Sequence, residues 1–525
     1  MFEFLKTGID GLDAILGGGI RYPAASSAFV FATGGAGSGK TILALEMLTR
    51  AWLDGEDGTT FLYYSVEHSP KNLFAKLQAD FDFFGAEAEI LELEQEVPHK
   101  VCLEARTPKG RTRMVLTQAD TSGLMSPGSG GFRIDVDWIL AEIGNYDLGG
   151  KVGMVCIDNV GLLLTDLDYF AKRAKLLETR RALMSKQIHG IFVREESDAD
   201  LRLPSAEEFS TDLLLHLSFL EVSGVFKARV IEILKARHQY YYRGHHHFSI
   251  AGRGIQRDVY LGARNERGPG LHIYPSVAAQ LSIARDHADF RVPPRGVDPI
   301  DLGHPDLNAA FHPDYRPTAN SSTILLAEPG TRYTFLALRF LSAAAVEGEQ
   351  TLLVSTKEDR EALRSICADR TELLPCLQDD GNFNSSFRVL YLHPEFISSG
   401  KFAWDIMRVA QGGHGHEGQE PLSRMVFDNI FQLQSRFPLL DNQQFMVHAL
   451  LDLLRYQGVT PFFVDLVPPG AGHGLANINP SPYLTTFDNV LHLYLDESDG
   501  EARPYIRVLK STAMESLQPA IPLRY

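Results

Sequence analysis

Short apolar runs alternate with helical patterns along the first part of the chain. The runs are continuously apolar, as buried parallel strands are, and they lie at residues 28–32, 60–64, 152–157 and 190–193. Helical patterns fill residues 42–53 and 169–186 between them. Such alternation predicts an α/β domain with a largely parallel sheet. Two later runs, 212–222 and 228–236, lie close together and predict strands added at the edge of that sheet.

The same alternation begins again after a proline-rich stretch at residues 292–317, and it includes an internal repeat. Four short motifs of the first half return in the same order in the second half. The pairs are TGIDGLD at 7 with RGVDPID at 295, VCIDN at 155 with VFDN at 426, DLLLHL at 212 with DNVLHL at 488, and VIEILK at 230 with YIRVLK at 505. We therefore expect two tandem copies of one domain, at residues 1–290 and 291–525.

Composition narrows the possible environments. The 525 residues carry a formal charge of −16, which argues against nucleic-acid binding over the whole surface. The four cysteines form no disulfide or metal-knuckle pattern, no apolar run is long enough to span a bilayer, and the start lacks the features of a secretory signal. We expect a cytoplasmic protein without membrane contact.

The sequence also contains a basic stretch and a run of three histidines whose roles it does not determine. The basic stretch Arg106–Arg113 (RTPKGRTR) fits a solvated loop or, alternatively, a loop that lines a pore or binds a partner. His245, His246 and His247 precede a strand pattern, and adjacent strand residues point to opposite faces, so the three cannot all bind one metal ion.

The clearest chemical signal is a glycine-rich loop between an apolar run and a helical pattern. It matches G-x-x-x-x-G-K-[ST]. Its glycines would let backbone N–H groups wrap a phosphate, its lysine would reach the β- and γ-phosphates of ATP, and its threonine hydroxyl would bind Mg²⁺. The candidate nucleotide-binding residues are Gly34, Gly35, Ala36, Gly37, Ser38, Gly39, Lys40, Thr41 and Ile42.

Two carboxylates follow other apolar runs. Asp158 ends the run 152–157, and the carboxyl end of a buried parallel strand is where ligands bind in such sheets. An aspartate that caps the next segment would look alike, but with a phosphate loop upstream we favour Asp158, with Thr41, as the Mg²⁺ residue. Glu67 follows the run 60–64 and could polarise the attacking water, a role that the chemistry alone leaves open.

Together these residues resemble the RecA-type ATPases, and most closely their KaiC-like branch. The stretches that carry the resemblance are TGIDGLDAILGGGI at 7–20, SVEHSP at 65–70, EILKAR at 232–237 and GLHIYP at 270–275. The resemblance implies that Glu67 is the catalytic glutamate and that Lys235 and Arg237 reach the γ-phosphate of a neighbouring subunit. Two positions depart from the family: His68 replaces the second glutamate of KaiC, and His238 replaces a glycine. An insertion near 256–269 interrupts the resemblance.

The second copy has lost much of this pattern. Its loop, Ala327–Thr334, has one glycine and lacks the Gly-Lys pair, and we expect it to be shorter than the first loop. Lys357 stands in the place of Glu67, although a shift of one residue would offer Glu358. The Lys-x-Arg motif has become Lys510-Ser511-Thr512, and Asp428 alone is retained. We expect this copy to be a degenerate scaffold or partner-binding domain that does not hydrolyse ATP.

The resemblance implies two tandem RecA-like α/β domains, each a mainly parallel sheet flanked by helices. We expect an ATPase, with ATP and Mg²⁺ bound in the first domain, that forms a homo-oligomeric ring, a hexamer. Hydrolysis would act as a conformational switch in a regulatory assembly whose protein partner the sequence does not name. Two other functions stay open: a DNA-associated recombination motor, and a non-catalytic ATP sensor that controls assembly. We infer no circadian or autokinase role, because the second copy lacks a recognisable Ser-Thr phosphorylation pair.

Overall fold

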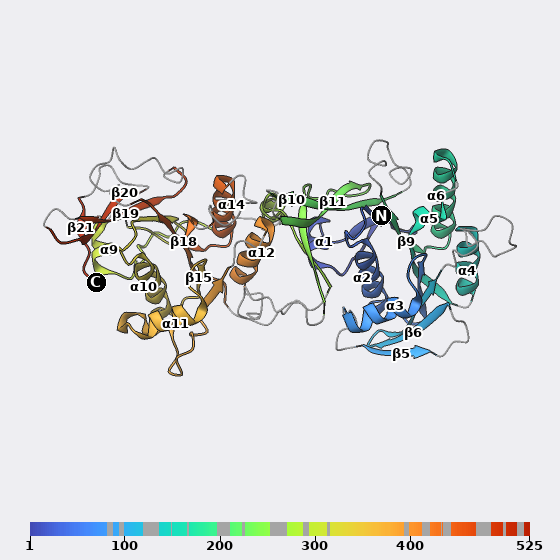
Figure 1. The fold of residues 1–525 in the computed structure, drawn as a ribbon, viewed down its shortest axis with the longest axis horizontal. Coiled ribbons are helices and arrows are strands. Elements are labelled where there is room, and N and C mark those ends of the chain that lie inside the picture. The colour runs from blue at the N-terminus through green and yellow to red at the C-terminus, as the bar shows by residue number, and fades with distance from the viewer. Residues whose placement is uncertain are drawn as a thin grey trace. The chain divides into compact units, whose positions relative to one another are not determined.

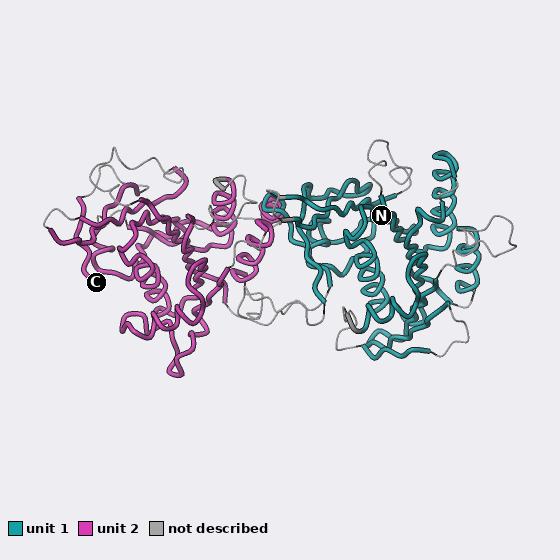
Figure 2. The backbone as a smooth tube through the Cα atoms, viewed as in Figure 1, with its two compact units in different colours: residues 1–256, 267–279 teal, residues 257–266, 280–525 magenta. Residues whose placement is uncertain are grey.

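The structure, a computed structural model, falls into two compact units, residues 1–256 with 267–279 and residues 257–266 with 280–525 (Figure 2). Each unit has its own sheet and its own buried core. The predicted insertion at 256–269 and Thr512 lie outside the described part of the chain. The described residues are 1–80, 88–93, 99–118, 136–148, 150–164, 167–196, 211–222, 226–252, 270–286, 293–311, 316–392, 398–411, 420–431, 433, 443–468, 485–496, 500–511 and 519–525.

The first unit is built on an eleven-stranded sheet (Figure 1). Its strands, in spatial order, are β13 (Gly270–Tyr274), β12 (His246–Ala251), β11 (Phe226–Ala236), β10 (Leu213–Val222), β3 (Phe29–Gly34), β9 (His189–Glu195), β8 (Lys151–Asp158), β4 (Thr59–Ser65), β7 (Gly110–Gln118), β6 (Lys100–Thr107) and β5 (Glu89–Leu93). The strands from β10 to β7 are parallel, and antiparallel strands extend the sheet on both sides. The prediction of a largely parallel sheet is confirmed. The prediction that β10 and β11 lie at the edge is wrong: β10 lies beside β3, and β11 lies between β10 and β12.

Helices cover both faces of this sheet, since successive residues of its central strands point to opposite sides. In β3, Val30 and Ala32 pack in the core under α2, whereas Phe29 and Phe31 pack in the core under α4 and α6. The helices on the first side are α1 (Asp10–Ile15), α2 (Lys40–Leu53) and α3 (Pro70–Ala75), which continues into the π-helix η1 (Lys76–Asp80). Those on the second side are α4 (Val136–Leu148), α5 (Val160–Leu163) and α6 (Tyr169–Met184). β1 (Phe2–Leu5) and β2 (Ile20–Pro23), which flank α1 in the chain, form a separate two-stranded antiparallel sheet.

The second unit repeats this architecture with eight strands. In spatial order they are β16 (Phe387–Tyr391), β15 (Thr351–Ser355), β17 (Arg424–Asp428), β18 (Thr460–Leu466), β14 (Thr323–Ala327), β19 (Asn489–Asp496), β20 (Arg503–Lys510) and β21 (Ile521–Pro522). This order matches the order from β7 to β12 in the first unit, strand for strand and direction for direction. Its helices are α8 (Val277–Asp286, which begins in the first unit), α9 (Pro305–Ala310), α10 (Tyr333–Val346), α11 (Arg360–Ala368), η5 (Thr371–Cys376), α12 (Ser399–Ala410) and α14 (Gln443–Tyr456). The two tandem RecA-like α/β domains are therefore present.

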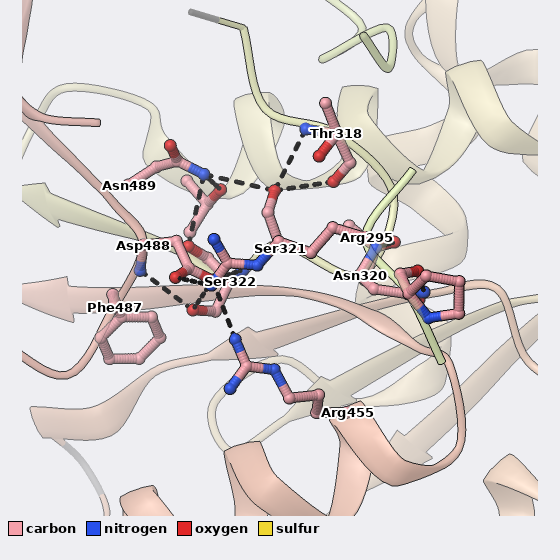
Figure 3. A network of polar contacts seen from close by, with 12 residues as sticks. Arg295, Thr318, Asn320, Ser321, Ser322, Arg455, Phe487, Asp488 and Asn489 are labelled. Carbon is pink, nitrogen blue, oxygen red and sulfur yellow. Dashed lines mark hydrogen bonds and ion pairs between the residues drawn. The ribbon is translucent and has the colours of Figure 1, made fainter. Parts of the chain in front are cut away.

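The repeated motif DLLLHL/DNVLHL has the same structural use in both units. Asp212 accepts a hydrogen bond from the backbone N–H of Phe29 at 3.2 Å, and Asp488 accepts one from the N–H of Ser322 at 2.9 Å. Each aspartate thereby ties the strand that it precedes to the strand that leads to the glycine-rich loop. Figure 3 shows the second network, in which Arg295 and Arg455 also approach Asp488. The motif VIEILK/YIRVLK is equally matched, because a β-bulge precedes the lysine in β11 and in β20.

The first repeated motif is used differently in the two units. Asp13 lies inside α1 and accepts hydrogen bonds from the N–H and the hydroxyl of Thr7, at 2.9 and 2.8 Å. Asp301 lies before α9 and accepts hydrogen bonds from the N–H of Gly303 and the amide of Asn308. The two seven-residue segments therefore occupy equivalent positions in their units, but their aspartates make different local contacts.

The basic stretch Arg106–Arg113 is a β-hairpin and not an extended loop. It comprises the end of β6, a tight turn and the start of β7. Two of its four cations pair with nearby carboxylates: Arg106 with Glu104 at 3.2 Å, and Lys109 with Asp54. A hairpin with half of its cations paired in this way fits the solvated-surface interpretation. No helix in the described part of the chain is both long enough and apolar enough to cross a membrane.

Candidate functional site

The glycine-rich loop joins β3 to α2, as the sequence predicts. At Gly34 a Cβ atom would lie 2.0 Å from the carbonyl oxygen of Leu217, so only glycine fits between these two strands. Gly39 caps α2 with a φ of +106°, a conformation that side-chain-bearing residues rarely adopt. The loop backbone therefore curls directly into the N-terminus of a fourteen-residue helix, an arrangement suited to binding phosphate.

Lys40 is the first residue of α2, and its side chain turns back over the loop. Its Nζ donates a hydrogen bond to the carbonyl oxygen of Gly35 at 2.7 Å and lies 3.5 Å from the hydroxyl of Ser38. Burial lowers the pKa of Lys40, and nearby carboxylates, Glu195 foremost, act against that shift. The ammonium group is thus held within the loop, where a phosphate would meet it.

Thr41 and Asp158, the two residues expected to bind Mg²⁺, are in direct contact. The hydroxyl of Thr41 donates to Oδ2 of Asp158 at 2.8 Å, although the two residues are far apart in the sequence. The hydroxyl of Tyr63 donates to the same oxygen at 2.7 Å. Hydroxyl and carboxylate oxygens are the hard ligands that Mg²⁺ prefers, so the residues present fit this ion.

A cavity of about 300 Å³ lies in front of the loop. The sequence predicted most of its polar wall, including Glu67, which follows the end of β4, and it did not predict Lys76 or Glu195. The lining residues are Gly37, Gly39, Lys40, Thr41, Ile42, Glu67, His68, Lys76, Asp158, Asn159, Val193, Glu195 and Ile250. Two adjacent carboxylates, Glu195 and Glu196, follow the buried run 190–193, and this position at the carboxyl end of a strand was a signal that the sequence offered.

Glu196 belongs to a polar cluster behind the loop. Its carboxylate lies 3.3 Å from Nδ1 of His216, and the same nitrogen lies 3.3 Å from the hydroxyl of Thr33. The contact with Glu196 raises the pKa of His216. The pKa of Glu196 is lowered, because hydrogen bonds from His216 and Thr33 outweigh the effect of burial. The cluster joins the carboxyl ends of β3 and β9 to the interior of β10, and these three strands position the loop.

Lys235 and Arg237 do not lie at this cavity. They stand at the end of β11, which runs antiparallel to β10, so the register pairs Ala236 with Leu213 at the start of β10. The start of β10 lies in turn beside Val30, near the start of β3 and away from the glycine-rich loop. Neither residue lines the cavity described above. The fold therefore separates these two side chains from the loop of their own chain.

The second loop corrects two expectations. It is not shorter: six positions separate the strand-end residue from the first helical residue in both copies, Gly34 to Lys40 and Ala327 to Tyr333. Nor is Asp428 the sole survivor, because the hydroxyl of Thr334 donates to its Oδ2 at 3.1 Å, as Thr41 does to Asp158. The expectation of a shorter second loop rested on its missing glycines. The structure shows that the loop keeps its length and its backbone path without them.

The register of the second unit also settles which residue replaces Glu67. Thr356 N–H donates to the carbonyl oxygen of Asp428 at 3.0 Å, as Val66 N–H does to that of Asp158 at 2.7 Å. The residue that follows Thr356 is Lys357, which therefore stands in the place of Glu67. Its ammonium pairs with Glu358 at 2.7 Å. In the place of Lys40 stands the buried phenol of Tyr333.

A larger cavity, of about 1100 Å³, lies at the opposite ends of the strands, where Thr59, Lys151 and His189 begin β4, β8 and β9. Charged groups in its wall pair with one another, for example Lys151 with Glu56 at 3.0 Å. Because ligands of open parallel sheets bind at the carboxyl ends of the strands, the smaller cavity is the better candidate site.

The three adjacent histidines have structural contacts. His246 is fully buried; its Nε2 lies 2.9 Å from the carbonyl oxygen of Tyr242, and its Nδ1 accepts a hydrogen bond from Ser276 N–H at 3.1 Å. His245 lies beside Glu232 at 3.6 Å. Within the described residues, no group of three or more histidine, cysteine, aspartate or glutamate side chains could hold a metal ion. His238, which replaces the expected glycine, approaches Asp212 at 3.5 Å.

Comparison with known proteins gives a consistent result. Residues 5–258 match the family model of the KaiC ATPase. The circadian clock protein KaiC2 of Synechocystis sp. is 24% identical over 97% of this chain and 77% of its own length. KaiC3 of the same organism is 22% identical over 97% of this chain and 87% of its own length. A UPF0273 protein of Aeropyrum pernix is 28% identical and matches 49% of this chain with 93% of its own length.

Proposed function

The chain is a KaiC-like protein of the RecA-type P-loop ATPases with a double-domain layout, and we propose that its first domain binds and slowly hydrolyses Mg·ATP. Hydrolysis would drive a conformational switch within a ring of identical subunits, a hexamer, that serves a regulatory assembly. The second domain would act as a scaffold or partner-binding module. KaiC2 and KaiC3 carry clock functions in their names, and we transfer none of these to the present chain.

The observation that carries this proposal is the hydrogen bond from Thr41 to Asp158 at the mouth of the loop that holds Lys40. In this arrangement Lys40 would bind the β- and γ-phosphates, while Thr41 and Asp158 would hold Mg²⁺, directly and through water. The ion would neutralise charge that develops on the phosphate oxygens. Glu67, at the edge of the same cavity, would orient and polarise the attacking water.

The place of Arg237 supports a ring. Because β11 carries Lys235 and Arg237 away from the loop of their own chain, they can reach a γ-phosphate only if it is bound by another subunit. Bound ATP would then lie between two chains, and its hydrolysis would loosen or tighten that interface. This coupling is what a conformational switch requires.

Mixed oligomers test the whole proposal. We expect Arg237→Ala protein to bind ATP without hydrolysing it, and Lys40→Ala protein to bind none. In mixed oligomers the two should recover part of the ATPase activity, because each supplies the group that the other lacks. The exposed Arg243, replaced by alanine, is the matched control and should keep full activity. Absence of recovery in oligomers shown by mass to be mixed would contradict catalysis across the interface.

The other two functions can be distinguished by the same proteins. A non-catalytic sensor would bind ATP tightly in the wild type without turnover. A DNA-associated motor would bind single-stranded DNA with a steep dependence on salt. The paired charges of the hairpin 106–113 speak against the second of these, and no other feature of the described chain favours it.

A further inference from the structure

Tyr63 is a buried residue that touches the candidate Mg²⁺ site and that no motif identifies. Its side chain lies in β4, is fully buried, and donates a hydrogen bond to Oδ2 of Asp158 at 2.7 Å. Thr41 donates to the same oxygen at 2.8 Å. One carboxylate oxygen therefore receives two hydroxyl donors. In the described part of the chain, Oδ1 of Asp158 receives no side-chain hydrogen bond.

The sheet register brings these groups together. Tyr63 lies opposite Cys156 on the neighbouring strand β8, and Ser65 lies opposite Asp158. Asp158 is thus the diagonal neighbour of Tyr63 on the same face of the sheet, at a distance that a long aromatic side chain spans. The same face packs against α2, from which Thr41 reaches the carboxylate.

The second domain serves as an internal comparison. Its register pairs Ser355 with Asp428, so Leu353 stands in the place of Tyr63 and offers no hydrogen bond. Oδ2 of Asp428 keeps the threonine donor, at 3.1 Å, and Oδ1 accepts a hydrogen bond from the side-chain amide of Asn429 at 3.3 Å. The carboxylate is therefore covered on both oxygens in the copy that has lost the lysine. In the first domain, Asn159 instead accepts a hydrogen bond from Gly161 N–H at 3.0 Å.

We propose that Tyr63 is a positioning residue for the Mg²⁺ site, which fixes the orientation of the Asp158 carboxylate that would hold the ion. The inference rests on the proposed function of the first domain. A neutral hydroxyl suits this task, because it fixes the carboxylate without cancelling the charge that attracts the cation, as a lysine or arginine would. Partners of this kind, one shell away from a metal, typically change its affinity by about 10- to 100-fold.

The experiment measures metal binding separately from catalysis. Full-length wild type and Tyr63→Phe are loaded with ADP, and the affinity of each complex for Mn²⁺, a spectroscopic substitute for Mg²⁺, is followed by electron paramagnetic resonance. We expect the Mn²⁺ affinity of Tyr63→Phe to fall about tenfold. The affinity for ADP in the presence of EDTA should stay within about twofold of the wild type, because the phosphate loop is untouched.

Two comparisons exclude a merely structural effect. Tyr64→Phe removes a buried hydroxyl group from the adjacent residue, which packs on the opposite face of the sheet against Trp138, and it should leave Mn²⁺ affinity unchanged. In an Asp158→Asn background, Tyr63→Phe should cause no further loss. Equal losses in Tyr63→Phe and Tyr64→Phe, unchanged affinity in Tyr63→Phe, or full additivity with Asp158→Asn would each overturn the inference. A wild type that binds no ADP would instead refute the proposed function.

Discussion

The glycine-rich loop of the first domain and the equivalent loop of the second share a backbone path and differ in chemistry. Gly37 and Gly330 both have left-handed φ values, +71° and +89°, and the residue before each helix is also left-handed, Gly39 at +106° and Arg332 at +52°. In both loops one backbone N–H closes a turn within the loop, Ser38 to Gly35 and Thr331 to Glu328. A strained left-handed arginine has thus been kept where the family pattern has glycine.

The two sites share the threonine–aspartate pair and differ at three other chemical positions. Tyr333 replaces Lys40, Lys357 replaces Glu67, and Leu353 replaces Tyr63. Burial raises the pKa of Asp428 to about 6, so this carboxylate takes up a proton in mildly acidic solution. The guanidinium of Arg332 lies over the ring of Tyr525, 5.4 Å from its centre, and not over the loop. The packed core therefore maintains the same strand-loop-helix backbone in both units. The side chains suited to binding phosphate are few, and the packing of the core does not require them.

The largest expected effect is on ATP affinity, and it comes from removing the lysine that only the first loop has. Lys40→Ala should lower the affinity for a fluorescent ATP analogue by at least about 10²-fold, since a buried charge partner of this kind contributes on the order of 2–5 kcal/mol. Tyr333→Ala, the equivalent change in the second domain, should leave ATP affinity unchanged. Fluorescence titration and a count of nucleotides per chain, expected to be one, provide the measurement. Two nucleotides per chain would show that the second loop binds ATP after all.

A second test exchanges the candidate base for its amide. Glu67→Gln should leave ATP bound and slow its hydrolysis by about 10²-fold, the usual cost of removing a positioned base. Lys357→Gln, at the equivalent position, should not change turnover. Single-turnover hydrolysis separates the chemical step from product release. If Glu67→Gln turns over normally, the assignment of the base is wrong, and His68, which lines the same cavity, becomes the next residue to test.

The sequence predicted those features whose cause is local. The continuous apolar run before Gly34, the glycines and the lysine at the helix start lie within a few residues of one another, so the loop could be recognised without a structure. Tyr63 could not, because its contact with Asp158 depends on the register between β4 and β8. The length of the second loop was misjudged for a related reason: glycine content was taken as a sign of backbone geometry, and Arg332 maintains that geometry without glycine. The strands β5 to β7 were missed because their apolar alternation is interrupted by charged residues.

The smallest expected effect concerns a histidine that both copies retain, His216 and His492, at matching positions of β10 and β19. His216 lies beside Glu196 and Thr33 and opposite Glu232 on β11. The positive charge of Lys40 acts to lower the pKa of His216. Its pKa is raised above the ordinary 6.5, so its contribution to stability is complete below that pH and is lost as pH rises through the folded value. The pKa of Glu196 is lowered below 4.5, so its contribution is lost only in acid. The ion pair should therefore stabilise most between about pH 4.5 and 6.5.

His492 should respond in the opposite direction. Burial, aided by Arg507, lowers its pKa to about 4, so stability is complete above pH 6.5 and is lost as pH falls. We expect His216→Asn to destabilise by about 1 kcal/mol at pH 6 and by less at pH 8.5, the scale of a partly buried ion pair. His492→Asn should instead reduce the loss of stability between pH 6.5 and pH 4.5. Urea unfolding midpoints across this range provide the measurement. If the effects of both substitutions on the unfolding midpoint changed in the same direction with pH, the two histidines would have similar electrostatic environments. The opposite effects expected from Glu196 and Arg507 would then be wrong.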